Sequence, residues 1–318
     1  MRKQKHEFAS VLAEHIKSYL LFMRGLERTF RVEEAILRAF DAFVCEREYN
    51  GELTQEIAID FAYSKPNLTS VQYAKRYRIL RNFAEYLSVF IPDTPLLDPK
   101  TMRGRVERHP AHIYSGDEIA LLLARAKTLG PANSPRPTLY YTLLGLLLSS
   151  GLRIGEAIKL DVRDVDLKEG LIHIRGTKFR KNRIVPVHDT TLQQLREYME
   201  ERNRFLLGAE QDAFFVNGRR KRLCYSTVVA TFIHLARAAG IRSESGQGPR
   251  LHDLRHTFAV RRVLSWYDAN EDIQARLPEL STYMGHAHFE DTTYYLTAGA
   301  ELMDRASGRF ENYWRDEQ

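Results

Sequence analysis

The sequence predicts a mainly helical α+β fold with a small antiparallel β-sheet. Three observations lead to this prediction. Apolar residues recur at helical spacing over most of the 318 residues. Two short runs rich in β-branched residues flank one polar, basic turn. Prolines interrupt the helical pattern near residue 100, which indicates that the chain is divided into two domains.

The first part of the chain has the pattern of a four-helix unit. Helical spacing covers residues 7–24, 32–47, 54–63 and 70–90. The last of these segments carries four basic residues, Lys75, Arg76, Arg78 and Arg81, interleaved with tyrosines. This pattern is typical of a helix that lies against DNA phosphates, and an ordinary solvated helix face is the alternative.

A proline-rich and basic stretch follows this unit. Pro92, Pro95, Pro99 and Pro110 lie in or beside it, and it contains several Lys and Arg residues. Because proline disfavours helix interiors, this composition predicts a linker. We expect an N-terminal helical DNA-binding domain at 1–98, a basic linker at 99–111 and a second domain at 112–318.

The second domain is expected to combine helices with a small sheet. Ser115 and Glu118 form a capping-box pattern at the start of a helix that extends to about residue 129. Further helices are expected at 138–149, 153–160, 190–206, 226–239, 252–266, 278–284, 289–297 and 300–314. Residues 170–176 and 183–187 are expected to be neighbouring strands joined by the basic turn between them.

Composition narrows the class of protein. The chain has 47 Lys and Arg against 41 Asp and Glu, a net charge of +6, which fits a nucleic-acid partner. Its two cysteines, Cys45 and Cys224, are too few for a disulfide framework. Since neither a signal peptide nor a membrane-spanning run is evident, we expect a cytoplasmic protein with no membrane partner.

Several residues match what metal-free phosphodiester transfer requires. This chemistry needs a nucleophile, cations on the non-bridging oxygens and an acid for the leaving oxygen. Arg153 follows a glycine break at the start of a helix, and Glu156 lies one turn later, where it can orient the arginine. His252 and Arg255 are three residues apart, so they share one helical face and can reach one phosphate.

Further candidates follow towards the C-terminus and in the sheet. His286 follows Gly285, and Tyr295 lies nine residues after His286. Tyrosine suits the nucleophile because its phosphoester is a reversible intermediate. Lys178 lies in the predicted turn between strands, from which a flexible cation can reach the scissile bond.

Four segments in this order, GLRIGE, GTKFRKNRIVPV, LHDLRHTFA and YMGHAHFEDTTYYL, resemble the tyrosine recombinase or phage integrase family, including its Xer-type and transposon-borne members. The resemblance is specific over about 140–300 and loose over the N-terminal helices. It implies that Arg153, Arg255 and His286 stabilise the phosphate and that His252 takes part in proton transfer or hydrogen bonding. It further implies that Glu156 supports Arg153, that Lys178 is the general acid and that Tyr295 is the nucleophile.

Two of these assignments have close competitors. Lys181 lies on the same turn as Lys178, and Arg180 adds charge there, so we expect Arg180 and Lys181 to contact DNA. Tyr294 adjoins Tyr295, but the nine-residue step from His286 favours Tyr295. His288 is an extra histidine that the family pattern does not require.

Metal and nucleotide sites are not expected. His252 and His256 are spaced as metal ligands can be, but the HExxH glutamate is missing and no cluster completes a ligand set. The glycines form neither a P-loop nor a dinucleotide fingerprint. We therefore predict a reaction without metal, ATP or another cofactor.

The resemblance also implies architecture and partners. Two domains would clamp double-stranded DNA at recombination sites, and four protomers, identical or mixed with related recombinases, would exchange strands in the nucleoid. The apolar pattern within 300–318 predicts a helix that packs either on a neighbouring protomer or on its own domain. Two alternative functions stay open, a topoisomerase with the same chemistry and a non-catalytic DNA-binding accessory protein.

Overall fold

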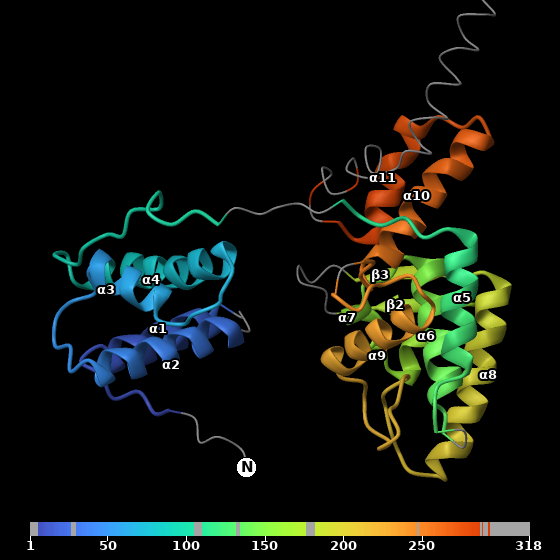
Figure 1. Ribbon diagram of the computed structural model, residues 1–318, viewed down its shortest axis with the longest axis horizontal. Coiled ribbons are helices and arrows are strands. Elements are labelled where there is room, and N and C mark those ends of the chain that lie inside the picture. The colour runs from blue at the N-terminus through green and yellow to red at the C-terminus, as the bar shows by residue number, and fades with distance from the viewer. Residues whose placement is uncertain are drawn as a thin grey trace, which may run out of the picture. The chain divides into compact units, whose positions relative to one another are not determined.

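Two compact units, residues 1–109 and 110–318, make up the chain (Figure 1). The computed structural model describes residues 6–26, 30–104, 110–131, 134–175, 182–246, 248–286, 288 and 292. The division between the units falls inside the stretch 99–111 that the sequence predicts to be a linker. Each unit has its own apolar core.

The N-terminal unit contains the expected helices. They are α1 (Ala13–Gly25), α2 (Arg31–Glu46), α3 (Gln55–Tyr63) and α4 (Ser70–Phe90). Their apolar faces meet in a core that includes Phe40, Phe61 and Phe83. Thr54 caps α3, and Thr69 begins α4 with a capping box, so side chains satisfy amide groups that a helix start leaves without partners.

The C-terminal unit is built mainly from helices around one long core. The elements are α5 (Gly116–Lys127), α6 (Arg136–Ser150), α7 (Ile154–Ala157), the 3-10 turn η1 (Val162–Asp164), β1 (Val165–Asp166), β2 (Leu171–Ile174), β3 (Arg183–Pro186), α8 (Asp189–Leu206), α9 (Tyr225–Ala238), α10 (Asp253–Asp268) and α11 (Ile273–Met284). The capping box predicted for Ser115 is present, since Ser115 Oγ accepts the Glu118 amide at 3.1 Å and the Glu118 carboxylate accepts the Ser115 amide at 2.9 Å.

The sheet is antiparallel, with strand order β1-β2-β3. Ile172 pairs with Val185, and Ile174 pairs with Arg183, so the two predicted strands are neighbours as expected. The short strand β1, in which Val165 pairs with Ile172, was not predicted. The register places Arg183 at the first position of β3, at the end of the sheet where β2 finishes.

Helix α6 runs through the middle of the C-terminal unit and packs against α5, α8 and α10 (Figure 1). It is apolar on all sides, and eight of its residues are buried. It ends at Gly151, which has a left-handed backbone with φ of 61°. A Cβ at this position would lie 2.4 Å from the Phe258 ring of α10, so only glycine allows the two elements to meet this closely.

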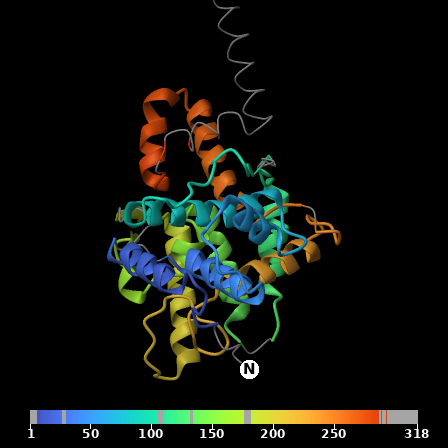
Figure 2. The same cartoon turned by 90° about the vertical axis from the view of Figure 1, so that its left-hand side faces the viewer.

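Helices α10 and α11 lie side by side at one end of this unit in both views (Figures 1 and 2). Val263, Leu264, Leu277 and Leu280 are buried among them in a separate small cluster. Helix α11 begins five residues before the predicted start at 278, since Asp272 caps it at Ile273. The helices predicted at 289–297 and 300–314 lie outside the described residues. No helix among the described residues is long and apolar enough to cross a membrane.

Candidate active site

The ends of helices α6 and α11 and the starts of helices α7 and α10 lie around the Arg255 guanidinium. Arg255 comes from the first turn of α10 and is only 2% exposed. Its two terminal nitrogens donate to Gly151 O at 2.6 Å and to Met284 O at 2.7 Å. These carbonyls end α6 and α11, where helix dipoles concentrate negative charge. Arg255 therefore links two helix ends and is held in a fixed place.

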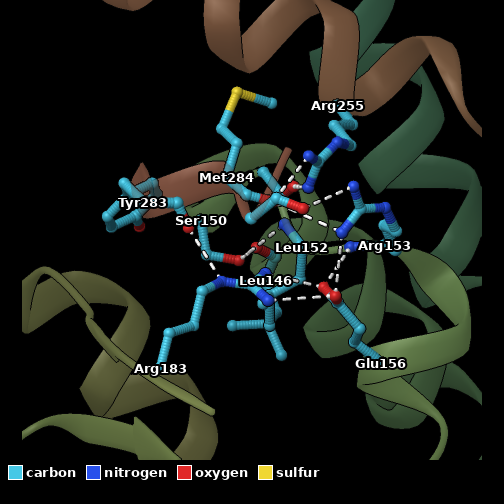
Figure 3. Close-up of polar contacts among 11 residues, drawn as sticks. Leu146, Ser150, Leu152, Arg153, Glu156, Arg183, Arg255, Tyr283 and Met284 are labelled. Atoms are coloured by element: carbon cyan, nitrogen blue, oxygen red, sulfur yellow. Dashed lines mark hydrogen bonds and ion pairs between the residues drawn. The ribbon is translucent and has the colours of Figure 1, made fainter. Parts of the chain in front are cut away.

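Arg153 approaches the same helix end from another direction (Figure 3). It precedes α7, and its guanidinium donates to Gly285 O at 2.8 Å and, at a longer 3.4 Å, to Met284 O. The Met284 carbonyl is thus shared by both arginines. The structure brings together two guanidiniums that the sequence predicted as partners on one phosphate.

Glu156 lies beside Arg153, as the sequence predicted. Its carboxylate accepts the Arg153 amide at 3.0 Å and the Arg153 side chain at 3.1 Å. Burial raises the pKa of Glu156, but hydrogen bonds and charge from Arg183 and Arg153 offset this effect, so the pKa is lowered overall. Glu156 is therefore a negative charge at neutral pH.

Arg183 is a site residue that sequence reasoning did not identify. It donates to both oxygens of Glu156, at 3.0 and 2.7 Å, and to Tyr283 O at 2.8 Å (Figure 3). Its position was read only as part of a strand. The sequence signal was weak, because Arg183 is the first residue of the run RIVPV and directly follows the basic turn, and its partners Glu156 and Tyr283 are distant in the chain.

His286 follows Gly285, the residue that caps the C-terminal end of α11. Its Nδ1 lies 2.7 Å from Thr292 Oγ1, and the Thr292 side chain is buried. Burial and, to a smaller extent, the charges of Arg255 and Arg153 together lower the pKa of His286 to about 3. His286 is therefore neutral at pH 7 next to two arginines.

His252 is the residue before α10 and lies close to His256, with ring centroids 4.8 Å apart. The surrounding protein displaces water and lowers the pKa of His252 to about 4, and His256 and Arg255 act in the same direction. The side chain nevertheless remains exposed, so solvent screens part of this effect. A neutral, accessible imidazole can accept or relay a proton.

Lys178, Arg180, Lys181, Tyr294 and Tyr295 lie outside the described residues. The described part of the site consequently consists of Arg153, Glu156, Arg183, Arg255, His286 and His252. It combines permanent cations with neutral imidazoles, an arrangement suited to binding an anion whose charge increases during reaction.

The basic residues of α4 do not share one environment. Arg78 is exposed, and Lys75 and Arg81 are partly exposed. Arg76, in contrast, is 9% exposed, and its guanidinium lies 3.9 Å from the Phe61 ring centroid. It donates to Phe61 O at 2.7 Å and Ser64 Oγ at 2.9 Å. We correct the expectation for Arg76, because these contacts bury its guanidinium inside the N-terminal unit and hold α3 and α4 together.

One group among the described residues offers three possible metal ligands, namely His6, Asp41 and Cys45 of the N-terminal unit. The Asp41 carboxylate already accepts the Ala9 amide at 2.9 Å and the Ser10 hydroxyl at 2.5 Å. His6 Nε2 lies 2.6 Å from the same carboxylate. These contacts tie the segment before α1 to α2, which explains the group without an ion.

Comparison with known proteins places this site in a family. The model of the phage integrase family matches residues 114–301. The putative integrase/recombinase y4rE of Sinorhizobium fredii is 37% identical over 302 residues, which cover 95% of this chain and 96% of that protein. Tyrosine recombinase XerC of Thermodesulfovibrio yellowstonii is 28% identical over 70% of this chain and 69% of its own length.

A solved structure shares the fold. The Tn1549 transposon integrase in complex with transposon right end DNA matches with a TM-score of 0.64 at 16% identity, covering 96% of this chain and 99% of that chain. At this identity the match concerns the fold alone. It agrees with the predicted combination of helices with a small antiparallel sheet.

Proposed function

The chain belongs to the phage integrase family of tyrosine recombinases, and we propose that it is a site-specific recombinase that joins DNA to Tyr295 through a 3′-phosphotyrosyl bond. One observation carries this proposal. The guanidiniums of Arg153 and Arg255 meet at the carbonyl of Met284, two residues before His286. Fixed cations of this kind stabilise a phosphorane-like transition state without reorganisation.

In the proposed reaction, Tyr295 Oη attacks the scissile phosphorus as its proton is lost. The bond from phosphorus to the 5′ oxygen breaks, and Lys178 donates a proton to that leaving oxygen. Arg153, Arg255 and His286 hold the non-bridging oxygens. The 5′ hydroxyl of another strand then attacks the phosphotyrosine and releases Tyr295, so the phosphodiester energy is kept and ATP is not needed.

The histidines and Glu156 have supporting parts in this proposal. Neutral His252 is accessible to solvent and can accept or return the proton that leaves Tyr295. A bound phosphate group that carries nearly two negative charges would raise the pKa of His286. His286 would then donate a hydrogen bond to this phosphate. Glu156 holds Arg153 in place through two contacts.

DNA binding is proposed to use both domains, 1–98 and 112–318, joined by the linker 99–111. Lys75, Arg78 and Arg81 would contact phosphates from α4, and Arg180 and Lys181 would do so from the β2–β3 turn. Two successive strand exchanges require two DNA sites and four protomers, so we propose a tetramer on DNA. Deletion of 308–318 tests whether the C-terminal tail takes part, since an unchanged assembly on DNA would contradict a role between protomers.

Covalent trapping tests the proposal most directly. Cells expressing wild type, Tyr295→Phe or Tyr294→Phe are lysed in SDS with EDTA, and DNA attached to protein is sequenced. We expect adducts at discrete sites in wild type and Tyr294→Phe, and none in Tyr295→Phe. Discrete adducts that persist in Tyr295→Phe and disappear in Tyr294→Phe would assign the nucleophile to Tyr294.

The same experiment separates the alternatives. Scattered adducts in wild type, together with relaxation of plasmids that lack a specific site, would favour a topoisomerase. A recovered target that is bound and left uncut by wild type would favour a DNA-binding accessory protein. Adducts that require a divalent ion would contradict the metal-free reaction.

A further inference from the structure

Arg183 connects three parts of the site that are separate in the sequence. Its side chain and that of Glu156 are each 11% exposed. Nη1 and Nη2 contact the two Glu156 oxygens, and Nε contacts Tyr283 O in the last turn of α11. The planar guanidinium fits this arrangement because it can donate in two directions at once.

We propose that Arg183 is a positioning residue for strand cleavage, which holds Glu156 on one side and the end of α11 on the other so that Arg153 and Arg255 are fixed for the phosphate. This inference rests on the proposed function of the site. Arg183 itself need not touch DNA in this proposal.

The contact between Arg183 and Glu156 determines the position of the Arg153 side chain. The Glu156 carboxylate accepts hydrogen bonds from two arginine side chains. Arg183 donates to both carboxylate oxygens, and Arg153 donates a further side-chain hydrogen bond. Loss of Arg183 would raise the pKa of Glu156 relative to wild type, because burial opposes ionisation and the largest contributions that lower this pKa come from Arg183. A carboxyl that is protonated or turned away no longer holds the Arg153 guanidinium.

The contact between Arg183 and the Tyr283 carbonyl holds the end of α11, which forms the other side of the site. The last carbonyls of a helix have no partners within the helix, and Arg183 satisfies one of them. The next two carbonyls, of Met284 and Gly285, bind Arg255 and Arg153. A shift of this turn therefore moves the acceptors of both arginines together with His286.

A double-mutant cycle separates positioning from general support of the fold. The variants are Arg183→Gln, Arg183→Lys, Glu156→Gln and the double Arg183→Gln/Glu156→Gln. Arg276→Gln is the matched control, since this α11 arginine pairs with Glu271 and Glu279 on the surface. The rate of covalent attachment is measured in single turnover on a nicked duplex that carries a site recovered by adduct sequencing, alongside DNA affinity and thermal unfolding.

We expect Arg183→Gln to attach DNA about 100-fold more slowly, as misplacement by about 1 Å can cause, with less than about three-fold change in affinity. Arg183→Lys keeps the positive charge but lacks the planar guanidinium with its several donors. This variant should attach DNA faster than Arg183→Gln and more slowly than wild type. Because Arg183 acts partly through Glu156 and partly through Tyr283 O, the losses of the two single variants should be less than additive in the double variant. A wild-type rate in Arg183→Gln, or additive losses in the double variant, would overturn the proposal.

The pH profile gives a readout that a purely structural role would not change. In Arg183→Gln the attachment rate should begin to fall at a higher pH than in wild type, because loss of the Arg183 hydrogen bonds and charge raises the pKa of Glu156. Glu156→Gln and the double variant cannot show this shift. Coincident profiles in wild type and Arg183→Gln would count against the proposal.

A DNA-free measurement distinguishes failure of the inference from failure of the proposed function. Carboxyl NMR reports the pKa of Glu156, and hydrogen exchange reports the amides of 284–286, in wild type, Arg183→Gln and Arg276→Gln. We expect a raised pKa and faster exchange in Arg183→Gln alone. If wild type forms no adduct, the proposed chemistry fails, while unchanged pKa and exchange in Arg183→Gln would refute the positioning role by themselves.

Discussion

The Gly285 backbone lies directly against the Arg183 guanidinium. A Cβ on Gly285 would be 2.9 Å from Nη1 of Arg183 and 3.1 Å from its Cζ. Gly285 also ends α11 in the left-handed region, with φ of 67°. The residue before His286 must therefore turn the chain and leave room for the arginine at the same time, and glycine meets both requirements.

Gly285→Ala should accordingly weaken both stability and the site. The left-handed backbone alone costs a non-glycine residue roughly 1–2 kcal/mol, and displacement of Arg183 adds to this. Urea unfolding measures the loss, and covalent attachment should slow as well. Gly145→Ala is the control, because a Cβ inside α6 meets nothing within 4 Å and alanine favours a helix interior by up to about 1 kcal/mol. Equal losses in the two variants would argue against this explanation.

Arg76 and Arg78 form a second matched pair, two positions apart on α4. Arg76→Ala removes a stacked, hydrogen-bonded cation and should destabilise the N-terminal unit by roughly 2–4 kcal/mol. Arg78→Ala should leave stability within about 0.5 kcal/mol but reduce the salt dependence of DNA affinity by about one phosphate contact. Thermal unfolding and titration of a random-sequence duplex at several salt concentrations check both. Unchanged stability in Arg76→Ala would contradict its structural role.

Ser115→Ala tests the capping box of α5. Loss of the hydroxyl leaves the Glu118 amide without its acceptor, so the free energy of unfolding should fall by about 1 kcal/mol. Ser265→Ala on α10 removes an exposed hydroxyl that donates to Arg262 O and should be close to neutral. Urea unfolding of both variants makes the comparison, and a larger effect at Ser265 would reverse the expectation.

The local elements were predictable because their signals are local. The capping box at Ser115, the paired strands and the helical spacing each depend on residues within a few positions of one another, and the structure confirms those of these elements that fall within the residues it describes. The strand β1 was missed because two residues, Val165 and Asp166, carry no alternation to detect. Its strand state depends on pairing with β2 instead.

The misreading of Arg76 has a related cause. By residue type alone, Arg76 cannot be distinguished from the other basic residues of α4. Its spacing differs, because Arg76 lies three and four positions before the buried Ile79 and Leu80. That spacing placed Arg76 on the apolar face of α4, and the guanidinium could be buried there because Phe61 O and Ser64 Oγ were available. The role of Arg183 had no comparable local signal. It depends on contacts with Glu156 and Tyr283, which are distant in the sequence and are brought near Arg183 by the fold.

Acid should destabilise the C-terminal unit through His286. Its pKa is lowered to about 3 in the folded protein, by burial and then by Arg255 and Arg153, against about 6.5 for a histidine in an unfolded chain. Between these values the unfolded state binds more protons, so the free energy of unfolding falls as the pH drops below about 6.5. Glu156, whose pKa is lowered, adds a loss only at more acidic pH.

Unfolding measured in urea from pH 7.5 to 5 should therefore show a smaller decline in His286→Gln than in wild type. The difference can reach about 1.4 kcal/mol per pH unit for one histidine once the pH lies well below 6.5. His234→Gln, an exposed histidine of α9, is the matched control. An identical decline in wild type and His286→Gln would mean that His286 keeps an ordinary pKa, so that burial and the two arginines do not hold it neutral in the folded protein.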